Sequence, residues 1–277
     1  MYVKKIIAML LALCMTFCAC AFAQEEATDL SLVDVKERGT LRVGMDKDYA
    51  PFCLIDETNE YTGFDVDFAY AVCDALNVAL EIVPLEWKDS RAALEEGRVD
   101  MLMGGLAQAD DDYLRYSYPY IETKTVIAVK GDSGLETMDA LKGKTIGLRE
   151  GACEKEVLEE NPDFYQTLSA AYSFPTAYEL LNAVENGKVD AALADALVVQ
   201  ARIEQGANLK AIEAPEAVWQ LTAAFPAGSA ALCSAVNDAM VTLAFNGVLS
   251  DMATDWFGSD ITILAHYLVE AEESEDE

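Results

Sequence analysis

LRVGMDKDYAPFCLIDETNEYTGFDVDF, residues 41–68, places a short apolar strand, a polar loop and the start of a helix in succession. Residues 41–45 are mostly apolar, and we predict a strand there. Phe64, Phe68 and Val72 then recur at helical spacing, so we predict a helix with one apolar face. A strand followed directly by such a helix begins a β–α–β unit.

The next segments continue the same alternation. Residues 80–85 and 99–103 are short apolar runs that we predict to be strands, and residues 90–96 between them fit a short helix. Gly97 stands where a left-handed residue commonly ends a helix. Strands that alternate with helices predict an α/β fold with a mostly parallel sheet covered by helices.

The second half of the chain repeats two motifs of the first half in the same order. GTLRVGM at residues 39–45 is echoed by GKTIGL at 143–148, and ALEEGRVD at 93–100 is echoed by AVENGKVD at 183–190. Each motif opens or closes a β–α–β unit, so the repeats predict two lobes of similar architecture. Ligands of such sheets lie beyond the carboxyl ends of the strands, so two facing lobes predict a ligand cleft between them.

The composition restricts the class of protein and of partner. The chain has 277 residues, 52% of them hydrophobic, which suits one large or two medium folded units. Its 19 basic and 49 acidic residues give a formal charge of −30, which argues against a nucleic acid or an anionic membrane surface as partner. His266 is the only histidine, and the sequence has neither zinc-ligand spacing nor a phosphate-binding glycine loop. We therefore predict no metal site and no cofactor.

Residues 1–23 have the pattern of a signal peptide. Two lysines precede an apolar run, and alanines stand at positions −3 and −1 of a cleavage site before Gln24. A membrane anchor is the alternative, because the apolar run approaches the length of a membrane span. Cleavage leaves 17 basic and 49 acidic residues, a charge of −32, in an extracytoplasmic protein of the periplasm or cell surface.

Two further features of the ends bear on the mature protein. Cys20 follows a small residue, as a lipid-modified cysteine does, so an N-terminal lipid anchor is an open alternative. Residues 266–277 form an acidic C-terminal stretch in which six of the last eight residues are Asp or Glu. Because like charges repel one another, we predict a solvated tail there.

Four cysteines remain after cleavage: Cys53, Cys73, Cys153 and Cys233. Outside the cytoplasm cysteines commonly pair, and four of them allow three pairings between which the sequence does not choose. Buried free thiols are an equally good interpretation.

Motifs along nearly the whole mature chain, residues 35–258, together resemble one known family. They are LRVGMD at 41–46, YAPF at 49–52, GFDVD at 63–67, YSYPY at 116–120, LKGKTIG at 141–147, GKVDA at 187–191, GVL at 247–249 and WFG at 256–258. In their order and spacing the chain is similar to the polar amino-acid solute-binding proteins of ABC importers, solute-binding protein family 3. The resemblance implies a monomer whose partners are a membrane permease and a small ligand, an amino acid or a related amine or amide.

The same resemblance implies the periplasmic-binding-protein type II fold. In that fold two similar α/β lobes, joined by two crossing hinge strands, close over a ligand. The resemblance puts lobe one at residues 35–126 plus 222–265 and lobe two at residues 127–221, with crossings near residues 126–128 and 221–223. Such hinges are a few residues that absorb the closing motion.

Carried over residue by residue, the family's ligand site falls on loops at strand ends. Asp46 and Tyr49 would meet the ligand from the first loop, with Phe52 beside them, and Trp87 would form the opposite wall. Asp195 would accept the ligand's α-ammonium group, although an aspartate there also makes a good helix N-cap. The remaining implied contacts are Gly104, Gly105, Ala107, Gly151, Ala152 and Cys153.

One departure from the family concerns the ligand carboxylate. The family normally places an arginine shortly after the loop at Ala107 to clamp that group, and this chain has aspartates at 110–112 instead. Ala152 and Cys153 also replace the family's usual Ser or Thr. Arg149 could substitute for the clamp if its side chain points inward. Otherwise the ligand is an amine, an amide or a short peptide.

Two other functions share this fold. A cyclohexadienyl-dehydratase-like enzyme would need a general acid, for which Glu150 and Glu154 beside the lobe-two loop are available. A sensory module with a degenerate site would fit the missing arginine and hydroxyl groups. We predict a binding protein without enzymatic activity, and turnover of prephenate or arogenate would distinguish the enzyme from it.

Overall fold

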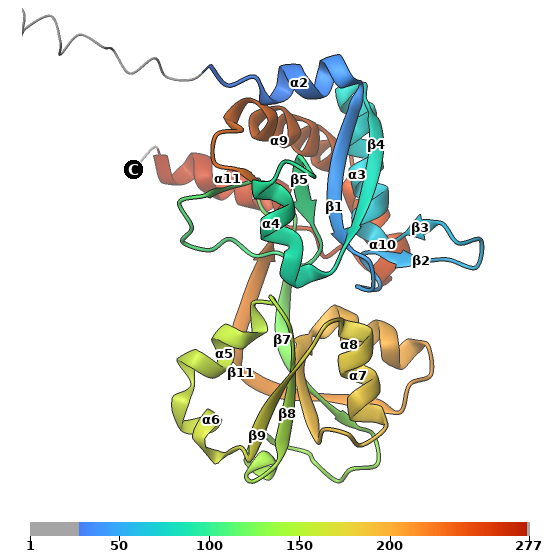
Figure 1. Ribbon diagram of the computed structural model, residues 1–277, viewed down its shortest axis with the longest axis vertical. Helices are drawn as coiled ribbons and strands as arrows, with labels where there is room; N and C mark the ends of the chain where they lie inside the picture. Colours follow the sequence, from blue (N-terminus) through green and yellow to red (C-terminus); the bar gives the residue numbers. More distant parts are fainter. Residues whose placement is uncertain (1–27, 276–277) are drawn as a thin grey trace, which may run out of the picture.

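The computed structural model describes residues 28–275, which form two lobes stacked along the long axis of the molecule (Figure 1). Lobe one is built on a five-stranded sheet of order β4-β1-β5-β12-β6, and lobe two on a five-stranded sheet of order β11-β7-β10-β8-β9. The two-lobed α/β architecture predicted from the repeated motifs is therefore confirmed. The predicted signal peptide, residues 1–23, lies outside the described residues.

Lobe one takes its elements from both ends of the chain. A short hairpin, β2 (Leu54–Ile55) with β3 (Tyr61–Thr62), projects from its side (Figure 1). The strands of its main sheet are β1 (Thr40–Asp46), β4 (Ala79–Leu85), β5 (Met101–Met103), β6 (Leu114–Tyr116) and β12 (Ala224–Pro226). Its helices are α2 (Ser31–Arg38), α3 (Phe64–Leu76), η1 (Trp87–Asp89), α4 (Ser90–Glu95), α9 (Ala230–Phe245), α10 (Val248–Phe257) and α11 (Leu264–Glu275).

Lobe two is formed by the middle of the chain. Its strands are β7 (Ile121–Lys130), β8 (Thr145–Arg149), β9 (Ala170–Phe174), β10 (Ala191–Asp195) and β11 (Leu209–Leu221). Its helices are η2 (Met138–Leu141), α5 (Glu154–Glu160), α6 (Pro162–Thr167), α7 (Ala177–Glu185) and α8 (Ala196–Glu204).

Both sheets are mixed, whereas the sequence analysis predicted mostly parallel ones. β1 pairs in parallel with β4 and β5, and β8 pairs in parallel with β9 and β10, as β–α–β units require. Within the two five-stranded sheets, the antiparallel pairs all involve β7, β11 or β12. β7 and β11 carry the chain from one lobe to the other and back, and β12 follows β11 into lobe one, so these strands run against their neighbours.

The two repeated motifs meet in space within each lobe. Asp100 accepts a hydrogen bond from the backbone N–H of Arg42 at 2.8 Å, and Asp190 accepts one from the backbone N–H of Thr145 at 2.9 Å. Gly97 and Gly187, three residues before each aspartate, have φ angles of 67° and 69°. A left-handed glycine therefore turns the chain so that the aspartate reaches the first strand in both lobes. This shared geometry explains why the motifs recur in the same order.

Strands β7 and β11 pair along their length and connect the lobes (Figure 1). Residues 126–129 of β7 are paired with β11 on one edge and with β10 on the other, so they lie inside the lobe-two sheet. The crossing expected near residues 126–128 therefore lies nearer the start of β7. After Leu221 ends β11, Ala224 already pairs with Leu102 in the lobe-one sheet. The exact lobe boundaries stay a prediction.

An aromatic cluster forms the core of lobe one. Phe52, Phe64, Phe68 and Tyr120 have no exposed surface, and the ring centroids of neighbouring pairs lie 5.3 to 6.4 Å apart. Truncating one such buried ring typically costs about 3–5 kcal/mol. The cluster lies directly behind the loop that follows β1, so that loop rests on a rigid base.

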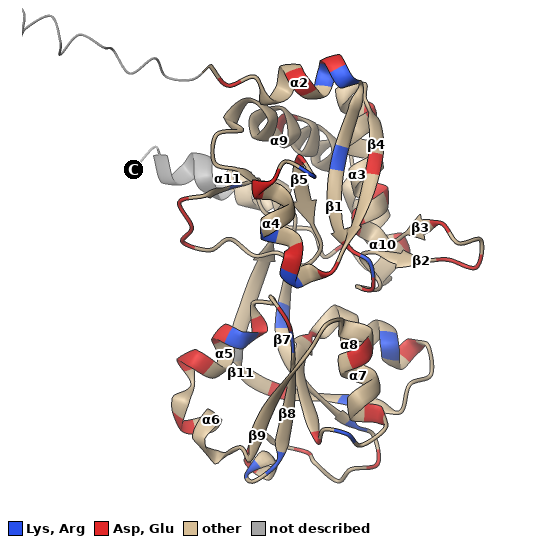
Figure 2. Cartoon of the chain, in the orientation of Figure 1, with Lys and Arg blue, Asp and Glu red and all other residues tan. Residues whose placement is uncertain are grey.

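The acidic residues are spread over both lobes (Figure 2). The C-terminal stretch that we predicted to be a solvated tail is helical as far as Glu275, in α11. Leu264 at the start of α11 is fully buried, and Leu268 packs against the lobe-one core. These apolar contacts anchor the first turns of the helix on lobe one.

Within residues 28–275, no single helix is long and apolar enough to cross a membrane. Helices α9 and α10 meet that criterion only as a pair, and the chain bends by 75° between them.

Candidate functional site

The residues predicted to bind a ligand converge between the lobes, at the carboxyl ends of strands. Asp46 ends β1 and Trp87 follows β4 in lobe one, while Arg149 ends β8 and Asp195 ends β10 in lobe two. The carboxyl ends of neighbouring parallel strands share one edge of a sheet, so these side chains gather there. We call the following group the junction: Asp46, Tyr49, Trp87, Arg149, Glu154 and Asp195.

An ion pair between the lobes lies at the centre of the junction. The Nη1 atom of Arg149 is 2.5 Å from the Oδ2 atom of Asp46, and the two side chains are only 2% and 1% exposed. The sequence left the direction of Arg149 open. The structure shows that its side chain points inward, toward lobe one.

Two aromatic rings enclose the same guanidinium group. The Cζ atom of Arg149 lies 4.1 Å from the ring centroid of Tyr49 and 5.5 Å from that of Trp87. Both rings are buried, with 2% and 3% of their surface exposed. A cation held over an aromatic face gains roughly 0.5–2 kcal/mol, with the larger values in desolvated sites. The rings and Asp46 therefore form a slot that suits a planar cation.

Glycines at the end of β5 make room for the two rings. A Cβ atom on Gly105 would lie 2.5 Å from the ring of Tyr49, and one on Gly104 would lie 3.3 Å from the ring of Trp87. Both glycines also have positive φ angles, 134° for Gly104 and 71° for Gly105. These two predicted site residues thus position the aromatic walls by their lack of a side chain.

Polar atoms without hydrogen-bond partners lie in the junction. Among the described residues, Nε and Nη2 of Arg149 and Oε2 of Glu154 are buried and have no partner. Glu154 begins α5 and is only 4% exposed. From the sequence we considered Glu154 only as a catalytic alternative and did not expect it among the ligand contacts. Its burial depends on how α5 packs against the loop after β8, which no local pattern reveals.

Asp195 has a structural role and also faces the junction charges. Its Oδ1 atom accepts hydrogen bonds from the backbone N–H groups of Leu197 and Val198, so it caps α8, and from the hydroxyl of Thr123 at 3.1 Å. Burial, together with the negative charge of Glu154, raises the pKa of Asp195 to about 7. The N-cap that the sequence offered as an alternative is present. The prediction that Asp195 binds the ligand ammonium group stays a prediction.

The junction holds more negative than positive charge. Burial opposes the charge on Arg149, but Tyr49, Asp46 and Glu154 together raise the pKa of the guanidinium above its ordinary value. The junction thus contains one permanent cation, Arg149, and three carboxyl groups, those of Asp46, Glu154 and Asp195, and Asp46 and Glu154 act on the cation directly. An added positive group beside Glu154 and Asp195 would reduce this imbalance.

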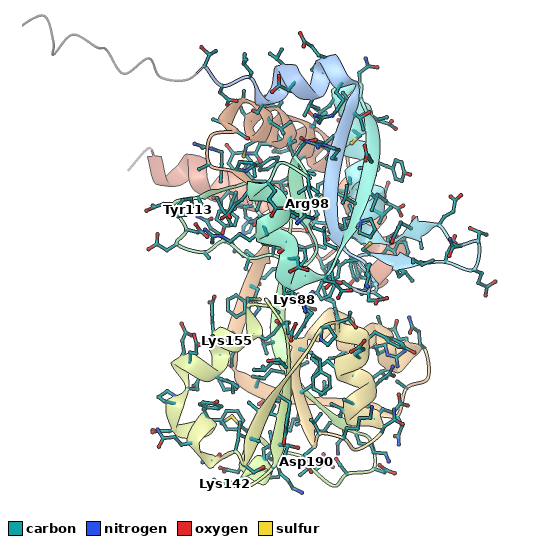
Figure 3. The ribbon with its side chains drawn as sticks, in the orientation of Figure 1. Lys88, Arg98, Tyr113, Lys142, Lys155 and Asp190 are labelled. Atoms are coloured by element: carbon teal, nitrogen blue, oxygen red, sulfur yellow. The ribbon has the colours of Figure 1, made fainter. Side chains whose placement is uncertain are left out.

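The loop after β8 closes the junction from lobe two. Gly151 has a φ of 75°, and a Cβ atom there would lie 3.3 Å from the Cα atom of Lys88 in lobe one. Lys88 lies where the lobes meet (Figure 3), and its Nζ atom is 3.3 Å from Oε2 of Glu150. Ala152 is buried, and Cys153 is partly buried. The backbone of this loop is thus in direct contact with lobe one.

Two predicted site residues support others. Phe52 has no exposed surface and stacks behind Tyr49, with 5.3 Å between ring centroids. Ala107 forms an isolated β-bridge with Leu221, at the end of the crossing strand β11. Both therefore fix loops of lobe one, and a direct ligand contact by either residue stays a prediction.

The aspartates that replace the family's arginine lie away from the junction. Asp110 and Asp112 are exposed. Asp111 pairs with Arg91 and accepts a hydrogen bond from the backbone N–H of Tyr113 at 2.9 Å, so it fixes a surface turn of lobe one. Arg115 is exposed as well and donates to the backbone carbonyl of Ala227.

The four cysteines of the described chain are free thiols, of which Cys53, Cys73 and Cys233 are buried and Cys153 is partly buried. Burial raises the pKa of each of these four thiols, to about 12 for Cys73. Of the two interpretations that the sequence allowed, the structure has the free thiols.

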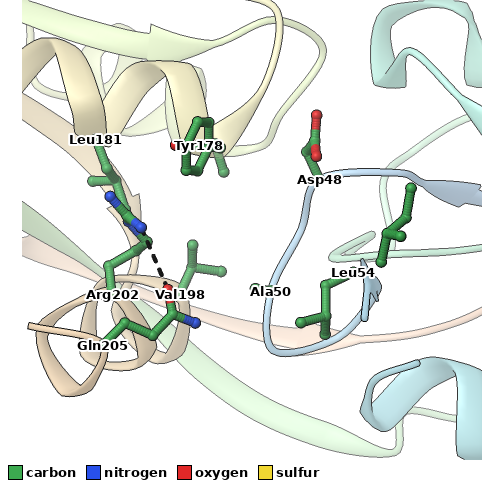
Figure 4. Close-up of a pocket in the computed structure, with 10 residues that line it drawn as sticks. Asp48, Ala50, Leu54, Tyr178, Leu181, Val198, Arg202 and Gln205 are labelled. Atoms are coloured by element: carbon green, nitrogen blue, oxygen red, sulfur yellow. Dashed lines mark hydrogen bonds between the residues drawn. The ribbon is translucent and has the colours of Figure 1, made fainter. Parts of the chain in front are cut away.

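A cavity of about 240 Å³ lies beside the junction, between the loop that carries Tyr49 and helices α7 and α8 (Figure 4). Asp48 and Ala50 line it from lobe one, and Tyr178 and Arg202 line it from lobe two. Its lining includes none of the ligand-binding residues predicted from the sequence.

Comparisons with known proteins agree with this architecture. A family model described as bacterial extracellular solute-binding proteins, family 3, matches residues 41–259. The L-cystine-binding protein TcyJ of Escherichia coli is 31% identical over 233 residues, which cover 82% of this chain and 86% of that protein. The arginine-binding extracellular protein ArtP of Bacillus subtilis is 26% identical over 268 residues, which cover 92% of this chain and 98% of that protein.

Solved structures show the same fold. A substrate-binding protein of an ABC uptake transporter from Streptococcus pneumoniae, with bound histidine, matches with a TM-score of 0.81 at 22% identity. The match covers 85% of this chain and 99% of that one, and at this identity it concerns the fold alone. The ancestral amino-acid-binding protein AncCDT-1, described as a precursor of cyclohexadienyl dehydratase, has a TM-score of 0.75 at 27% identity, covering 82% of this chain and 99% of that one.

Proposed function

Since the chain belongs to the bacterial extracellular solute-binding proteins of family 3, we propose that it captures an α-amino acid between its lobes for an ABC importer. The protein works outside the cytoplasm, as members of this family do. We assign the ligand site to the junction.

The observation that carries this proposal is the set of unpartnered polar atoms in the junction. Nε and Nη2 of Arg149 are N–H donors, and Oε2 of Glu154 is an acceptor. A buried polar group left without a partner costs about 1–3 kcal/mol, and more if it is charged. A ligand that carries both a carboxylate and an ammonium group would satisfy both kinds of atom at once. An α-amino acid is the simplest such molecule.

The roles of the junction residues follow from their charges. Arg149 would hold the ligand α-carboxylate through its free N–H groups, in place of the arginine that the family usually has in lobe one. Glu154 and Asp195 would accept the α-ammonium group. The loop at Gly151, Ala152 and Cys153 would contribute backbone groups from lobe two. The site would then hold the carboxylate and the ammonium group of the ligand mainly from lobe two.

The relatives support an amino-acid ligand. TcyJ and ArtP are named for binding L-cystine and arginine, and the solved neighbour from Streptococcus pneumoniae holds histidine. We propose that the ligand of this chain belongs to the same chemical class. The aspartates at 110–112 do not enter this assignment, because they lie on the surface of lobe one.

Ligand access requires the lobes to separate. Asp46 and Arg149 are at most 2% exposed, so a ligand reaches them only when the lobes move apart. We propose that β7 and β11 bend at the crossing and that the closed form docks on a membrane permease as a monomer. A lipid anchor through Cys20 would hold the protein at that membrane, and this residue lies outside the described ones.

The family membership favours a binding protein over an enzyme. The neighbour AncCDT-1 is itself described as an amino-acid-binding protein. We propose that Glu154 contacts the ligand ammonium group and does not act as a general acid. The test is incubation with prephenate and arogenate, in which we expect no product.

A thermal-shift screen of residues 24–277 against the L-amino acids, L-cystine, amino-acid amides and polyamines tests the main proposal. A ligand at 100 times its Kd adds about 2.7 kcal/mol of stability, which is a measurable shift. We expect shifts with one or more α-amino acids, and weaker ones with their amides because Arg149 then lacks a carboxylate. Shifts with polyamines or amides alone would contradict the assigned role of Arg149.

Two matched variants, Glu154→Gln and Glu150→Gln, test the proposed site. Each replaces a glutamate beside the loop after β8. Glu154 is buried without a partner at Oε2, whereas Glu150 pairs with Lys88 and is partly exposed. Losing a charged hydrogen bond in a closed site typically costs 2–5 kcal/mol of binding. We therefore expect Glu154→Gln to weaken amino-acid binding by at least tenfold and Glu150→Gln to change it less than threefold. Equal effects of the two substitutions would argue against the proposed site.

A further inference from the structure

We propose that Arg149 is a built-in cation which fills the slot between Asp46, Tyr49 and Trp87, and that it thereby excludes ligands with a cationic side chain. The filling of the slot rests on the geometry alone. The consequence for ligand choice rests on the proposed function. We call the space enclosed by Asp46 and the two rings the cation slot.

The cation slot has the chemistry of a recognition site for a guanidinium or ammonium group. A buried carboxylate and two aromatic faces all favour positive charge. Asp46 ends β1 and Trp87 follows the neighbouring strand β4, so lobe one builds the slot by itself. The cation comes from lobe two, at the last residue of β8. An arginine of this chain therefore lies where a ligand cation would be expected to bind.

A ligand cation would have to displace Arg149 from the cation slot, and two effects oppose this displacement. The guanidinium is tethered to β8, so its effective concentration at the slot is millimolar or higher. Displacement would also leave Arg149 buried without its carboxylate partner and close to a second positive charge. A ligand with a neutral side chain does not need to displace Arg149, so neither effect opposes its binding. The slot should therefore select against arginine and lysine as ligands, although such side chains fit its chemistry.

The unpartnered atoms of Arg149 agree with this assignment. Asp46 accepts a hydrogen bond from Nη1 of Arg149 only, which leaves Nε and Nη2 buried and without a hydrogen-bond partner. The free edge of the guanidinium therefore offers donors to an anionic group. One side of Arg149 is used to fill the slot, and the other side is available to the ligand.

The first test removes the built-in cation and supplies it again from solution. Arg149→Ala deletes the atoms that ethylguanidinium contains, so ethylguanidinium should bind in the vacated slot. We expect millimolar ethylguanidinium chloride to raise the Tm of Arg149→Ala by several degrees in a saturable manner and to leave the wild-type Tm unchanged. Sodium chloride at equal ionic strength corrects for screening, and ethylammonium should stabilise less because it lacks the planar shape.

Two variants make this test specific. In Asp46→Asn/Arg149→Ala the carboxylate of the slot is gone, so the ethylguanidinium effect should disappear. In Arg202→Ala the lost guanidinium also lies over a tyrosine, 4.9 Å from the ring centroid of Tyr178, but its carboxylate partner is 3.7 Å away and it is 16% exposed. We expect no saturable rescue of Arg202→Ala. Equal rescue of all three variants, or none of Arg149→Ala, would overturn the assignment of the slot.

The second test uses the unmodified chain and so does not depend on the folding of a variant. L-citrulline and L-arginine have nearly the same shape, but only L-arginine has a charged side chain. By calorimetry we expect L-citrulline to bind the wild-type protein at least tenfold more tightly than L-arginine, and L-norleucine more tightly than L-lysine. Equal or tighter binding of the cationic member of each pair would overturn the proposed selectivity.

The two tests separate the inference from the proposed function. If ethylguanidinium rescues Arg149→Ala but no amino acid binds the wild-type protein, the slot is real and the proposed function fails. If amino acids bind without rescue and without charge selectivity, the proposed function stands and the inference fails.

Discussion

Arg149 of β8 and Asp46 of β1 pair across the two lobes, with 2.5 Å between Nη1 and Oδ2. The two residues belong to different sheets and each ends its strand, so neither residue reaches the other unless the lobes are closed. The pair is almost fully shielded from water, which sets it apart from the exposed Lys88–Glu150 contact at the edge of the same interface.

Removing Arg149 should destabilise the protein strongly because it leaves the carboxylate of Asp46 buried and unpaired. Breaking one side of a buried ion pair typically costs about 3–5 kcal/mol. We expect a loss of this size in the unfolding free energy of Arg149→Met, measured by urea denaturation. Asp46→Asn/Arg149→Met should lose less than Arg149→Met, since no charge remains.

The control for this prediction is Lys88→Gln, which breaks the exposed pair between the lobes. Its two side chains are 52% and 33% exposed, so the expected loss is below about 1 kcal/mol. A loss in Lys88→Gln as large as that in Arg149→Met would show that burial of the pair does not determine its contribution.

The same pair should hold the unliganded lobes together. In Asp46→Asn/Arg149→Met the buried ion pair between the lobes is gone, while the core of each lobe is unchanged. We expect small-angle scattering without ligand to give a larger radius of gyration for this variant than for the wild type. An identical radius in both proteins would mean that other contacts close the lobes. Lys88→Gln again serves as the control, with no expected change in radius.

Asp65 should make the protein less stable as the pH rises toward neutrality. Its side chain is fully buried at the start of α3, and burial raises its pKa to about 7 against a partly offsetting hydrogen bond from Tyr120. The folded protein then binds a proton between pH 4 and pH 7 that the unfolded chain has released. Stability from this group is therefore complete below pH 4 and falls as the pH rises through 7, by about 1.4 kcal/mol per unit at most.

The substitution Asp65→Asn tests this pH dependence, because it keeps an oxygen for the Tyr120 hydroxyl and removes the titration. We expect urea denaturation to show Asp65→Asn gaining stability relative to the wild type between pH 4.5 and pH 8. Asp111→Asn is the control, since hydrogen bonds and Arg91 lower the pKa of that partly exposed carboxyl and place its titration below this range. Parallel profiles of the wild type and Asp65→Asn would contradict the prediction.

Ligand affinity should depend on pH through Asp195. Burial and Glu154 raise the pKa of Asp195 to about 7, and an ammonium group bound beside it favours the ionised form. Below pH 7 the ligand must therefore expel a proton, so affinity should fall by up to about tenfold per pH unit. Calorimetry at pH 5.5 and pH 8 with an amino acid found in the screen measures this effect.

Asp195→Asn should remove most of that pH dependence. Asn still accepts the α8 backbone hydrogen bonds as an N-cap, so the fold is expected to persist. Affinity at pH 8 should fall because the carboxylate charge is absent. An unchanged affinity at pH 8 would show that Asp195 acts only as a helix cap.

The four thiols should be free and slow to react in the folded protein. Burial raises their pKa values, so little thiolate is present at neutral pH. With a thiol-specific disulfide reagent at pH 8, we expect residues 24–277 to react fully in guanidinium chloride and only slowly when native. Two reactive thiols after denaturation without reductant would indicate a disulfide in place of two free cysteines.

Much of the fold could be predicted from local sequence. Phe64, Phe68 and Val72 recur at helical spacing, and α3 buries all three of them. Gly97 and Gly187 end helices in left-handed conformations, and the aspartate three residues after each reaches the first strand of its lobe. These features depend on neighbours in the chain or within one β–α–β unit, so a sequence pattern records them.

The direction in which β7 and β11 run relative to their neighbours was not predictable in the same way. β7 and β11 are long strands that pair antiparallel with each other, and the apolar pattern of their own residues does not show in which direction they pair. Their direction follows from the path of the chain between the lobes. The sheets are therefore mixed, although the β–α–β units within them are parallel as expected.

The sequence by itself determined the two lobes, the family and the loops that could meet a ligand, because each of these depends on short-range patterns. Only the tertiary structure decided that Arg149 points into the junction, that Glu154 is buried there and that Asp110 and Asp112 are not. A strand-end side chain can point into either face of its sheet, and its partners come from the other lobe. The chemistry of the junction therefore exists only when the two lobes lie against each other.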